Sequence, residues 1–180
     1  MLPGFKFRDK HCSELNIIMR SKKRPLLSAI KQQYESVPGQ NGSYDFSDNT
    51  LDDGFVQLEC VVKSESVTDL RSKARQIAAW LSGNGKLSFD DEPGLVYIGR
   101  MVNQIDITQV VTMGPFTLQF RCKPYAFDKE SQQIFNITTA PETVALKIGG
   151  TTPTPPRILV VNKGAATIPS LSISTETEID

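Results

Sequence analysis

Residues 55–62, FVQLECVV, alternate between apolar and polar side chains. A period of two is typical of a β-strand with one face in a core and the other in solvent. The inward set consists of Val56, Leu58, Cys60 and Val62. The segment therefore predicts a half-buried strand, in which the Cys60 thiol packs as a small hydrophobic group and does not act as a nucleophile.

Further strands are predicted on both sides of this segment. Residues 116–122, FTLQFRC, alternate in the same way, and their inward positions are Phe116, Leu118, Phe120 and Cys122. The apolar run 15–19, LNIIM, is of strand type, and we interpret the basic residues 22–24 that follow it as a solvated turn before Pro25. Residues 102–111, of mixed pattern, are predicted as another strand. The chain is thus expected to be mainly β.

One segment changes period. Residues 66–81, SVTDLRSKARQIAAWL, carry apolar side chains at helical spacing, namely Leu70, Ala74, Ile77 and Leu81. This spacing predicts an amphipathic helix, with Ser66 and Asp69 as capping residues and Gly83 as its stop. Trp80 flanks the apolar stripe and is expected to clamp the helix onto a sheet.

The segment 88–101, SFDDEPGLVYIGRM, has three consecutive acids, Asp90, Asp91 and Glu92, directly before Pro-Gly. Neighbours on a strand point to opposite sides, so Asp90 and Asp91 cannot hold one proton or one metal ion. Asp90 and Glu92 share a side, about 6–7 Å apart, which is at the edge of the spacing in inverting glycosidases. We interpret the acids as belonging to a turn over residues 92–95 between two strands, and as pairing with Arg100 or another base.

Residues 36–49, SVPGQNGSYDFSDN, are rich in residues that form turns. They predict the tip of a hairpin or a long ordered loop. The glycines follow neither of the phosphate-binding spacings, G-x-x-x-x-G-K-[ST] or G-x-G-x-x-G. We therefore favour a turn that holds no ligand.

The composition argues against several classes of protein. Twenty basic and twenty acidic residues cancel, so no overall field attracts nucleic acid or an anionic membrane. No apolar run reaches the ~20 residues that cross a bilayer. The start of the chain lacks the apolar region of a signal peptide, which indicates folding in a reducing cytoplasm. Three widely spaced cysteines do not predict a disulfide framework.

The chain has a single histidine, His11. A zinc site with two histidines is impossible within one such chain, and a nucleophile–base pair would need His11 with Cys12 or with a distant serine. Adjacent residues rarely point at one another, so we interpret His11 as a surface or turn residue. The sequence therefore predicts no catalytic, cofactor-binding or metal-binding residue, and the protein is not expected to be an enzyme.

The pattern of strands breaks at KPYAFDKES, which predicts a domain edge near residues 124–135. We expect a first domain over residues 1–130 and a second part over residues 131–180. The second part contains the stiff segment TTPTPP and the strand-like segments RILVV, residues 157–161, and SLSIS, residues 170–174. So few short strands cannot close a sandwich. We interpret residues 131–180 as a linker and the beginning of a second β domain.

Four segments in order carry a resemblance to a known family. They are VPGQNGSYDF, the helix end RQIAAWL, LSFDDEPGLVYIGR and PFTLQFRCKPYAF. Together they cover about residues 15–128. In this order they resemble the N-terminal region of the distal tail proteins, or Dit proteins, of siphophages and their prophages.

The resemblance implies a fold and a role. The fold would be an N-terminal β-sandwich with one helix and a protruding hairpin, followed by a galectin-like or carbohydrate-binding-module-like sandwich. The role would be structural: a hexameric ring at the virion tail tip that joins the tail tube to the tail-fibre or tail-lysin assembly, with host attachment through a receptor-binding protein. Partners would be other copies of the chain, the tube protein and the lysin or fibre hub, without specific nucleic-acid or membrane binding and without a cofactor.

Two alternatives stay open on the residues themselves. A carbohydrate-binding module for host cell-wall polysaccharide would use Tyr97, Trp80 or Tyr125 as its stacking platform. A hydrolase would use Asp90 and Glu92.

Overall fold

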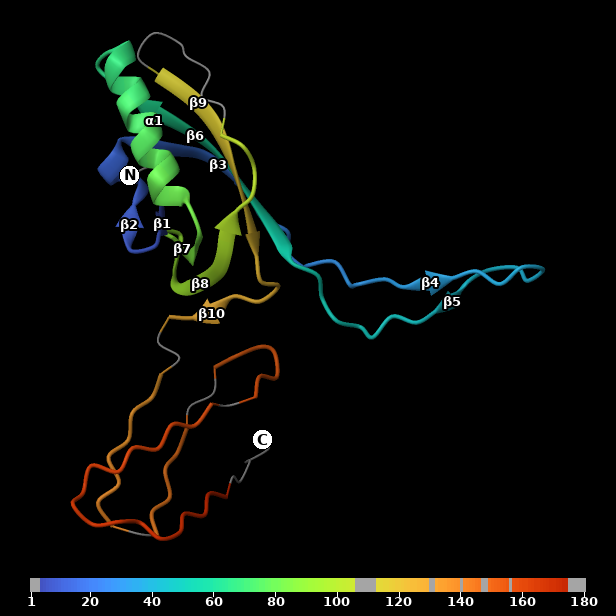
Figure 1. Cartoon of the computed structure of the whole chain (residues 1–180), viewed down its shortest axis with the longest axis vertical. Coiled ribbons are helices and arrows are strands. Elements are labelled where there is room, and N and C mark those ends of the chain that lie inside the picture. The colour runs from blue at the N-terminus through green and yellow to red at the C-terminus, as the bar shows by residue number, and fades with distance from the viewer. Residues whose placement is uncertain are drawn as a thin grey trace. The chain divides into compact units, whose positions relative to one another are not determined.

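A computed structural model describes residues 4–105, 113–129, 132–139, 141–146, 149–155 and 157–174. The structure divides into a larger unit, Met1–Val144, and a smaller unit, Ala145–Asp180. All helices and strands assigned among the described residues belong to the larger unit (Figure 1). The expected domain boundary after residue 130 stays a prediction, and most of the strand predicted at residues 102–111 lies outside the described residues.

The larger unit is built on one antiparallel sheet. Its strands follow the order β2-β1-β7-β8-β9-β6-β3, and β10 (Phe127–Asp128) pairs with β8 off this path. The strands of the path are β1 (Phe5–Phe7), β2 (Lys10–His11), β3 (Ile17–Lys23), β6 (Gly54–Lys63), β7 (Asn84–Phe89), β8 (Glu92–Met101) and β9 (Met113–Cys122). One α-helix, α1 (Val67–Leu81), is assigned in the part of the chain that the structure describes. The predicted class, mainly β with one helix, is confirmed.

The longest ladder of the sheet joins β6 to β9 over ten residue pairs. Its pairs Leu58↔Leu118 and Cys60↔Phe116 lie on the face that the alternation predicted to be inward. The inward side chains of both strands are at most 5% exposed and join one core cluster with α1 and β1. Both predicted strands are therefore confirmed, with the thiols of Cys60 and Cys122 in the core.

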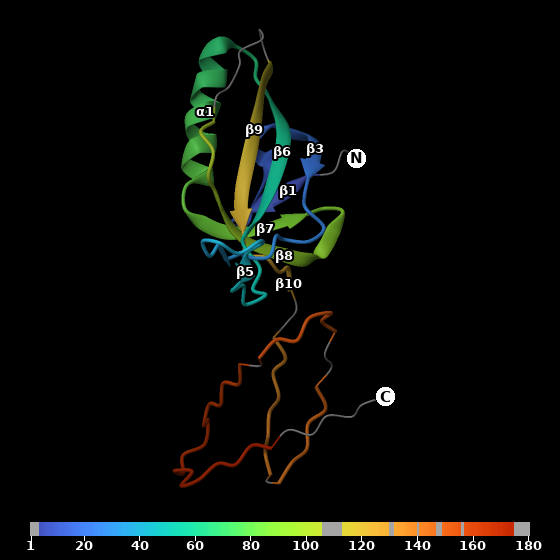
Figure 2. The same cartoon turned by 90° about the vertical axis from the view of Figure 1, so that its right-hand side faces the viewer.

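The sheet bends so that two wings enclose the core (Figure 2). One wing is β2-β1-β7 and the other is β9-β6-β3, and β8 belongs to both because it pairs first with β7 and then with β9. Buried residues of both wings, among them Phe5, Leu87 and Leu58, form one cluster. The two layers expected of a sandwich are thus two wings of one continuous sheet.

Gly99 lies where β8 passes from one wing to the other, opposite Gly85 on β7 and Cys122 on β9. A Cβ at this position would lie 2.6 Å from the Cys122 Sγ and 2.7 Å from the Arg121 carbonyl oxygen. Both distances are shorter than a normal van der Waals contact. The second is to a backbone oxygen, which cannot move away by a change of side-chain rotamer. Glycine is therefore required at the crossing because β8 and β9 approach there without room for a side chain.

Helix α1 begins and ends as its sequence predicts. The Ser66 hydroxyl accepts a hydrogen bond from the Asp69 N–H at 3.1 Å, and the Asp69 carboxylate accepts one from the Glu65 N–H, also at 3.1 Å. The helix ends before Gly83, which has a φ of +87°. Its buried residues are Leu70, Ile77 and Leu81, three of the four positions of the predicted stripe, while Ala74 is half-buried.

Trp80 fastens α1 to the first strand. Its indole N–H donates to the Phe7 carbonyl oxygen at 2.9 Å, and its ring stacks on Phe5 with 5.7 Å between centroids. The indole N–H thus has a hydrogen-bond acceptor while the ring packs against the core. The expected clamp between helix and sheet is confirmed.

The prediction at residues 15–24 is partly wrong. Leu15 belongs to a 3-10 helix, η1 (Cys12–Leu15), which ends at Asn16 in the left-handed conformation with φ 55°. Strand β3 begins at Ile17 and continues through Lys23. The basic residues predicted to form a solvated turn therefore start inside a strand, because Lys22 and Lys23 keep their ladder with β6.

The turn predicted at residues 92–95 lies elsewhere. The β7–β8 hairpin turns at residues 90–91, since Phe89 already pairs with Glu92. Pro93 and Gly94 lie inside β8, where the register shifts, and the Gly94 carbonyl accepts a hydrogen bond from Lys129 at 2.9 Å. A proline lacks the N–H that a ladder needs, so it fits such an irregularity.

The smaller unit shows no assigned helix or strand among its described residues. The segments 157–161 and 170–174, predicted as strands, are not paired there, and strand assignment requires ladder hydrogen bonds. Their apolar side chains are exposed: Ile158, Leu159, Val160, Val161, Leu171 and Ile173. A second sandwich therefore stays a prediction.

No helix in the described part of the chain is long and apolar enough to cross a membrane.

Replacing Gly99 by alanine tests the crossing. We expect Gly99→Ala to lower the free energy of unfolding by about 1–3 kcal/mol, the usual cost of forcing extra volume into a packed site. Gly94→Ala is the matched control, because a Cβ at Gly94 meets nothing within 4 Å. Urea unfolding measures both. Equal stability of the two variants would contradict the steric requirement at Gly99.

Candidate assembly arm and its anchor

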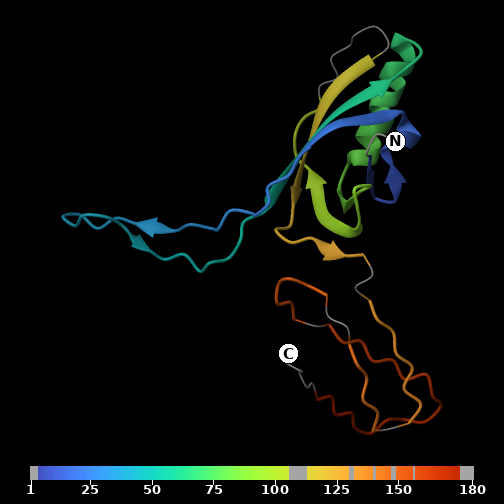
Figure 3. The ribbon, with the colours of Figure 1, turned by 180° about the vertical axis from the view of Figure 1, so that it is seen from behind.

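A long hairpin leaves the end of β3 and returns at the start of β6 (Figures 1 and 3). We call residues 25–53 the arm. Its limbs pair through β4 (Tyr34–Glu35) and β5 (Tyr44–Asp45), and again through a bridge between Ile30 and Leu51. Gly39 and Gly42, with φ of +84° and +88°, lie at its tip. The hairpin tip predicted for residues 36–49 is confirmed.

The arm exposes most of its apolar side chains. Leu26 is fully exposed, and the other large exposed apolar residues of the arm are Leu27, Ile30, Tyr34, Val37, Tyr44 and Phe46. The arm also contains five acids and one lysine. An isolated two-stranded hairpin is marginally stable in water, and a concentration of exposed apolar side chains marks an interaction surface.

Each of the three acids at the β7–β8 turn binds its own partners. The Asp90 carboxylate accepts a hydrogen bond from the Gly4 N–H at 2.8 Å and lies 3.3 Å from the His11 Nε2. Asp91 and Glu92 form ion pairs with basic residues at the end of β3. No two of the acids share a partner, so the arrangement does not hold one proton between a carboxylate pair.

Arg24, directly before the arm, binds Glu92 through two nitrogens. Its Nη2 donates to the Glu92 Oε1 at 2.7 Å, and its Nη1 donates to the Glu92 Oε2 and to the Tyr97 hydroxyl. The Tyr97 hydroxyl donates to the Glu92 Oε2 at 3.1 Å. The guanidinium carbon lies 5.1 Å from the centre of the Tyr97 ring. We call Arg24, Glu92 and Tyr97 the latch.

Lys22 reinforces the latch from two residues earlier on β3. Its Nζ lies 2.6 Å from the Asp91 Oδ2 and 4.4 Å from the centre of the Phe89 ring. The acids were predicted to pair with Arg100 or another base; Arg100 lies opposite Asn84 in the β7–β8 ladder, and the bases that pair with them are Lys22 and Arg24. The acids thus pair with β3, and two of the three basic residues predicted to be solvated are engaged.

The charges of the latch stabilise one another. Hydrogen bonds from Arg24 hold the pKa of Glu92 below its ordinary value, and the same contact raises the pKa of Arg24. Burial raises the pKa of Tyr97. At neutral pH the latch therefore consists of a guanidinium, a carboxylate and a neutral phenol, the combination that gives strong charge-assisted hydrogen bonds.

The second limb of the arm is anchored separately. Asp53, the last arm residue, accepts a hydrogen bond from the Arg121 Nε on β9 at 2.6 Å. Beside it, a Cβ on Gly54 would lie 3.0 Å from the Ser28 Oγ, and Ser28 is only 8% exposed. Both limbs are therefore tied to the sheet at their root by an ion pair.

His11 is a capping residue. Its Nδ1 lies 2.7 Å from the Ser13 Oγ and accepts the Ser13 N–H at 3.2 Å, while the Glu14 carboxylate accepts the His11 N–H at 2.9 Å. These contacts form the capping box of η1. Neighbouring Cys12 is buried, and burial raises the pKa of its thiol. The residues that the sequence offered as a nucleophile–base pair thus stabilise a turn.

The aromatic residues of the carbohydrate alternative are mostly engaged within the fold. Trp80 is bound to Phe7, and Tyr97 belongs to the latch. Tyr125 is 45% exposed and takes part neither in the Trp80–Phe7 contact nor in the latch. The structure therefore does not bring the three rings together as one stacking platform.

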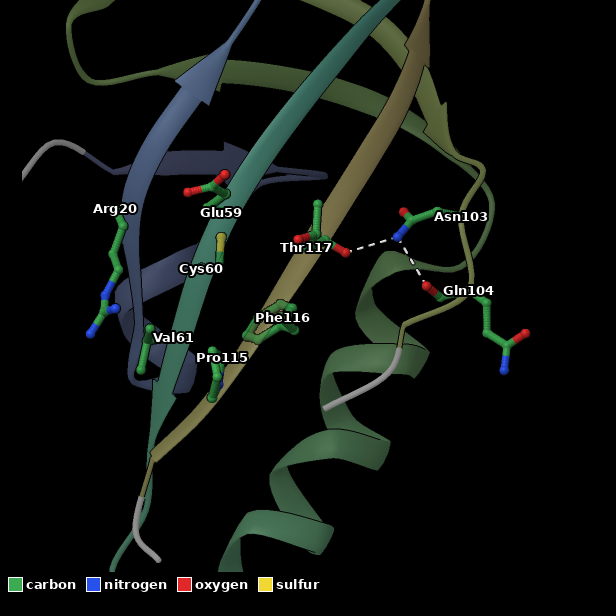
Figure 4. Close-up of a pocket in the computed structure, with 9 residues that line it drawn as sticks. All are labelled: Arg20, Glu59, Cys60, Val61, Asn103, Gln104, Pro115, Phe116 and Thr117. Carbon is green, nitrogen blue, oxygen red and sulfur yellow. Dashed lines mark hydrogen bonds between the residues drawn. The ribbon is translucent and has the colours of Figure 1, made fainter. Parts of the chain in front are cut away.

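An open hollow of about 430 Å³ lies along β3, β6 and β9 (Figure 4). Its only charged lining residues are Arg20 and Glu59; the others are Cys60, Val61, Asn103, Gln104, Pro115, Phe116 and Thr117. The Asn103 amide donates to the Thr117 and Gln104 carbonyls, and its oxygen accepts the Gln119 N–H at 2.6 Å. Asn103 therefore continues the pairing of β9 where β8 has ended.

Within the described residues, no three His, Cys, Asp or Glu side chains gather to hold a metal ion.

Residues 10–122 match the family model described as the phage tail protein RIFT-related domain. The match spans more than half of the chain. The chain belongs to this phage tail protein family. The arm, the latch, helix α1 and the strands from β2 to β9 all lie within the matched region.

A solved structure has the same fold. The phage tail protein is similar to the SPP1 Dit protein, gp 19.1, whose crystal structure is described as a paradigm of the hub adsorption apparatus in phages that infect Gram-positive bacteria. The TM-score is 0.61 at 17% sequence identity, over 71% of this chain and 53% of that one. This chain thus matches about half the length of that structure. No curated protein matches the chain in a sequence comparison. The resemblance to siphophage distal tail proteins is confirmed.

The pKa of Glu92 predicts how the latch responds to acid. Because its folded pKa is depressed, its stabilising contribution is present above the unfolded pKa near 4.5 and is lost as the pH falls through the folded pKa. We expect Glu92→Gln to cost roughly 1–3 kcal/mol of unfolding free energy at pH 7, and the difference from wild type to shrink below about pH 4.

Asp91→Asn is the control for this comparison, since Asp91 is more exposed, at 48% against 29% for Glu92. Its loss should stay below about 1 kcal/mol. Urea unfolding from pH 3 to pH 7 measures both variants. A cost of Glu92→Gln that does not change with pH would show that the carboxylate charge is not what stabilises the latch.

Proposed function

We propose that this phage tail protein is a structural hub subunit that assembles with its own copies into a ring, of six subunits, at the virion tail tip. The ring would join the tail tube to the tail-fibre or tail-lysin assembly. The observation that carries the proposal is the arm: a hairpin with exposed apolar side chains, anchored at its root and unpacked along its length.

The arm is suited to contact a neighbouring copy. Each limb has roughly 14 residues, which in extended form reach about 45 Å. The exposed aromatic side chains, Tyr34, Tyr44 and Phe46, are of the kind that anchor protein interfaces. A contact between one patch on each copy and a different patch on the next is heterologous, and it closes into a ring when the rotation between copies completes a circle.

The comparisons support the same role. The family is one of phage tail proteins, and the fold is shared with a Dit protein described as an adsorption hub. The proposed partners are the tube protein, the lysin or fibre hub and a receptor-binding protein. The proposed place is the tail tip of the virion, after synthesis in the host cytoplasm.

The proposed domain organisation assigns ring formation to residues 1–130. Residues 131–180 would form the linker and the beginning of a second β-sandwich. The proposed role is structural and not enzymatic, in keeping with acids that each bind a separate partner at the β7–β8 turn.

Truncating the aromatic side chains of the arm tests the proposal. We expect wild-type protein to give particles of six subunits in light scattering, with rings in electron micrographs. Tyr44→Ser combined with Phe46→Ser should raise the dissociation constant of the contact by roughly a thousandfold, because two aromatic anchors of about 2 kcal/mol each contribute about 4 kcal/mol.

Tyr125→Ser is the matched control, because Tyr125 has similar exposure but lies outside the arm. It should assemble as the wild type does. A wild-type protein that stays monomeric at high concentration would refute the ring. A double variant that still assembles fully would show that the arm does not carry the contact.

A further inference from the structure

The direction of the arm is set at its root. Among the described residues, the hydrogen bonds of Pro25 to Asp52 stay within the arm, as between Lys31 and Thr50 and between Phe46 and Gln33. The arm side chains are largely exposed along its length. Little beyond residue 28 therefore restrains the angle between arm and sheet, and the restraint must come from the groups that flank the arm.

The latch connects two distant parts of the sheet at this root. Strand β3 is the last strand of the β9-β6-β3 wing, whereas the β7–β8 turn belongs to the opposite wing. Arg24 extends from the end of β3 and binds Glu92 and Tyr97, which are 68 and 73 residues away in sequence. The residue after Arg24 is Pro25, followed by the exposed Leu26 and Leu27. The arm therefore starts directly at a fixed point that spans both wings.

The geometry of the latch resists rotation. Two parallel hydrogen bonds between a guanidinium and a carboxylate define an orientation, which a single ion pair does not. The Tyr97 hydroxyl adds a third partner, and its ring lies under the guanidinium. The other anchor, Arg121 with Asp53, is one hydrogen bond between more exposed groups, at 51% and 37%. The latch is thus the stronger of the two restraints.

We propose that Arg24, Glu92 and Tyr97 hold the direction in which the arm leaves the sheet, and that breaking their contacts turns residues 25–28 into a hinge. The latch orders the arm before it meets any partner. Such ordering lowers the conformational entropy that binding must otherwise remove. The latch is a property of the single chain and does not depend on ring formation.

The experiment measures the angle of the arm directly. Spin labels are placed on Asn41→Cys at the arm tip and Arg75→Cys on the exposed side of α1, and pulsed electron paramagnetic resonance gives the distribution of distances between them. The three native cysteines are buried, which protects them from labelling. All measurements use the full chain carrying Tyr44→Ser and Phe46→Ser, so that no neighbouring copy holds the arm.

With the latch intact, we expect one narrow distribution. Glu92→Gln and Arg24→Ala should each broaden it at least twofold, and Tyr97→Phe, which keeps the ring and removes the hydroxyl, should broaden it less. Asp53→Asn, which weakens the other anchor, should leave the width within about a fifth of the starting value. Circular dichroism confirms that each variant is folded.

Three results would overturn the latch: a broad distribution in the parent chain, unchanged widths in folded Glu92→Gln and Arg24→Ala, or equal broadening in Asp53→Asn. The result is separable from the proposed ring. A narrow parent distribution that broadens in the latch variants supports the latch even if light scattering shows only monomers.

Discussion

Ten residue pairs join β6 to β9, and the rest of the larger unit is attached to this ladder. One face of this ladder is almost entirely apolar and buried. Helix α1 and the two strands β1 and β7 pack over that face. Strand β8 pairs with β7 and then joins β9 through its last three residues, so the β6–β9 ladder also determines where the second wing begins. Gly99 permits this crossing because no side chain fits between β8 and β9 there.

A bent sheet of this kind needs a connection across its open side. The acidic turn supplies it, because Asp90 holds the start of the chain, while Asp91 and Glu92 hold the end of β3. In the sequence, these adjacent acids have the composition of a catalytic carboxylate pair. In the structure, each of them makes a separate structural contact. Each carboxylate has a donor of its own, which removes the like-charge repulsion that three adjacent acids would otherwise cause.

The arm and the β6–β9 ladder differ in where their apolar side chains lie, and both arrangements suit a subunit of an assembly. The ladder buries its apolar side chains within the chain, whereas the arm presents Tyr34, Tyr44 and Phe46 to the outside while its root is fixed by ion pairs on both limbs. A rigid body with an oriented extension that exposes aromatic side chains suits a subunit that must form the same contact with each neighbour. This is the physical link between the fold and the proposed hub role of a phage tail protein.

The strands at residues 55–62 and 116–122 and the helix at 66–81 were determined by sequence alone, since a buried face must repeat apolar residues at the period of its element. Local turn formers at residues 36–49 predicted a hairpin tip or a long ordered loop, and the structure shows which of the two it is. The position of the β7–β8 turn and the partners of its acids were not determined by the sequence. Arg24 and Glu92 are 68 residues apart, and each could pair with any of twenty opposite charges. Only the bend of the sheet brings β3 to that turn, and no local period encodes it.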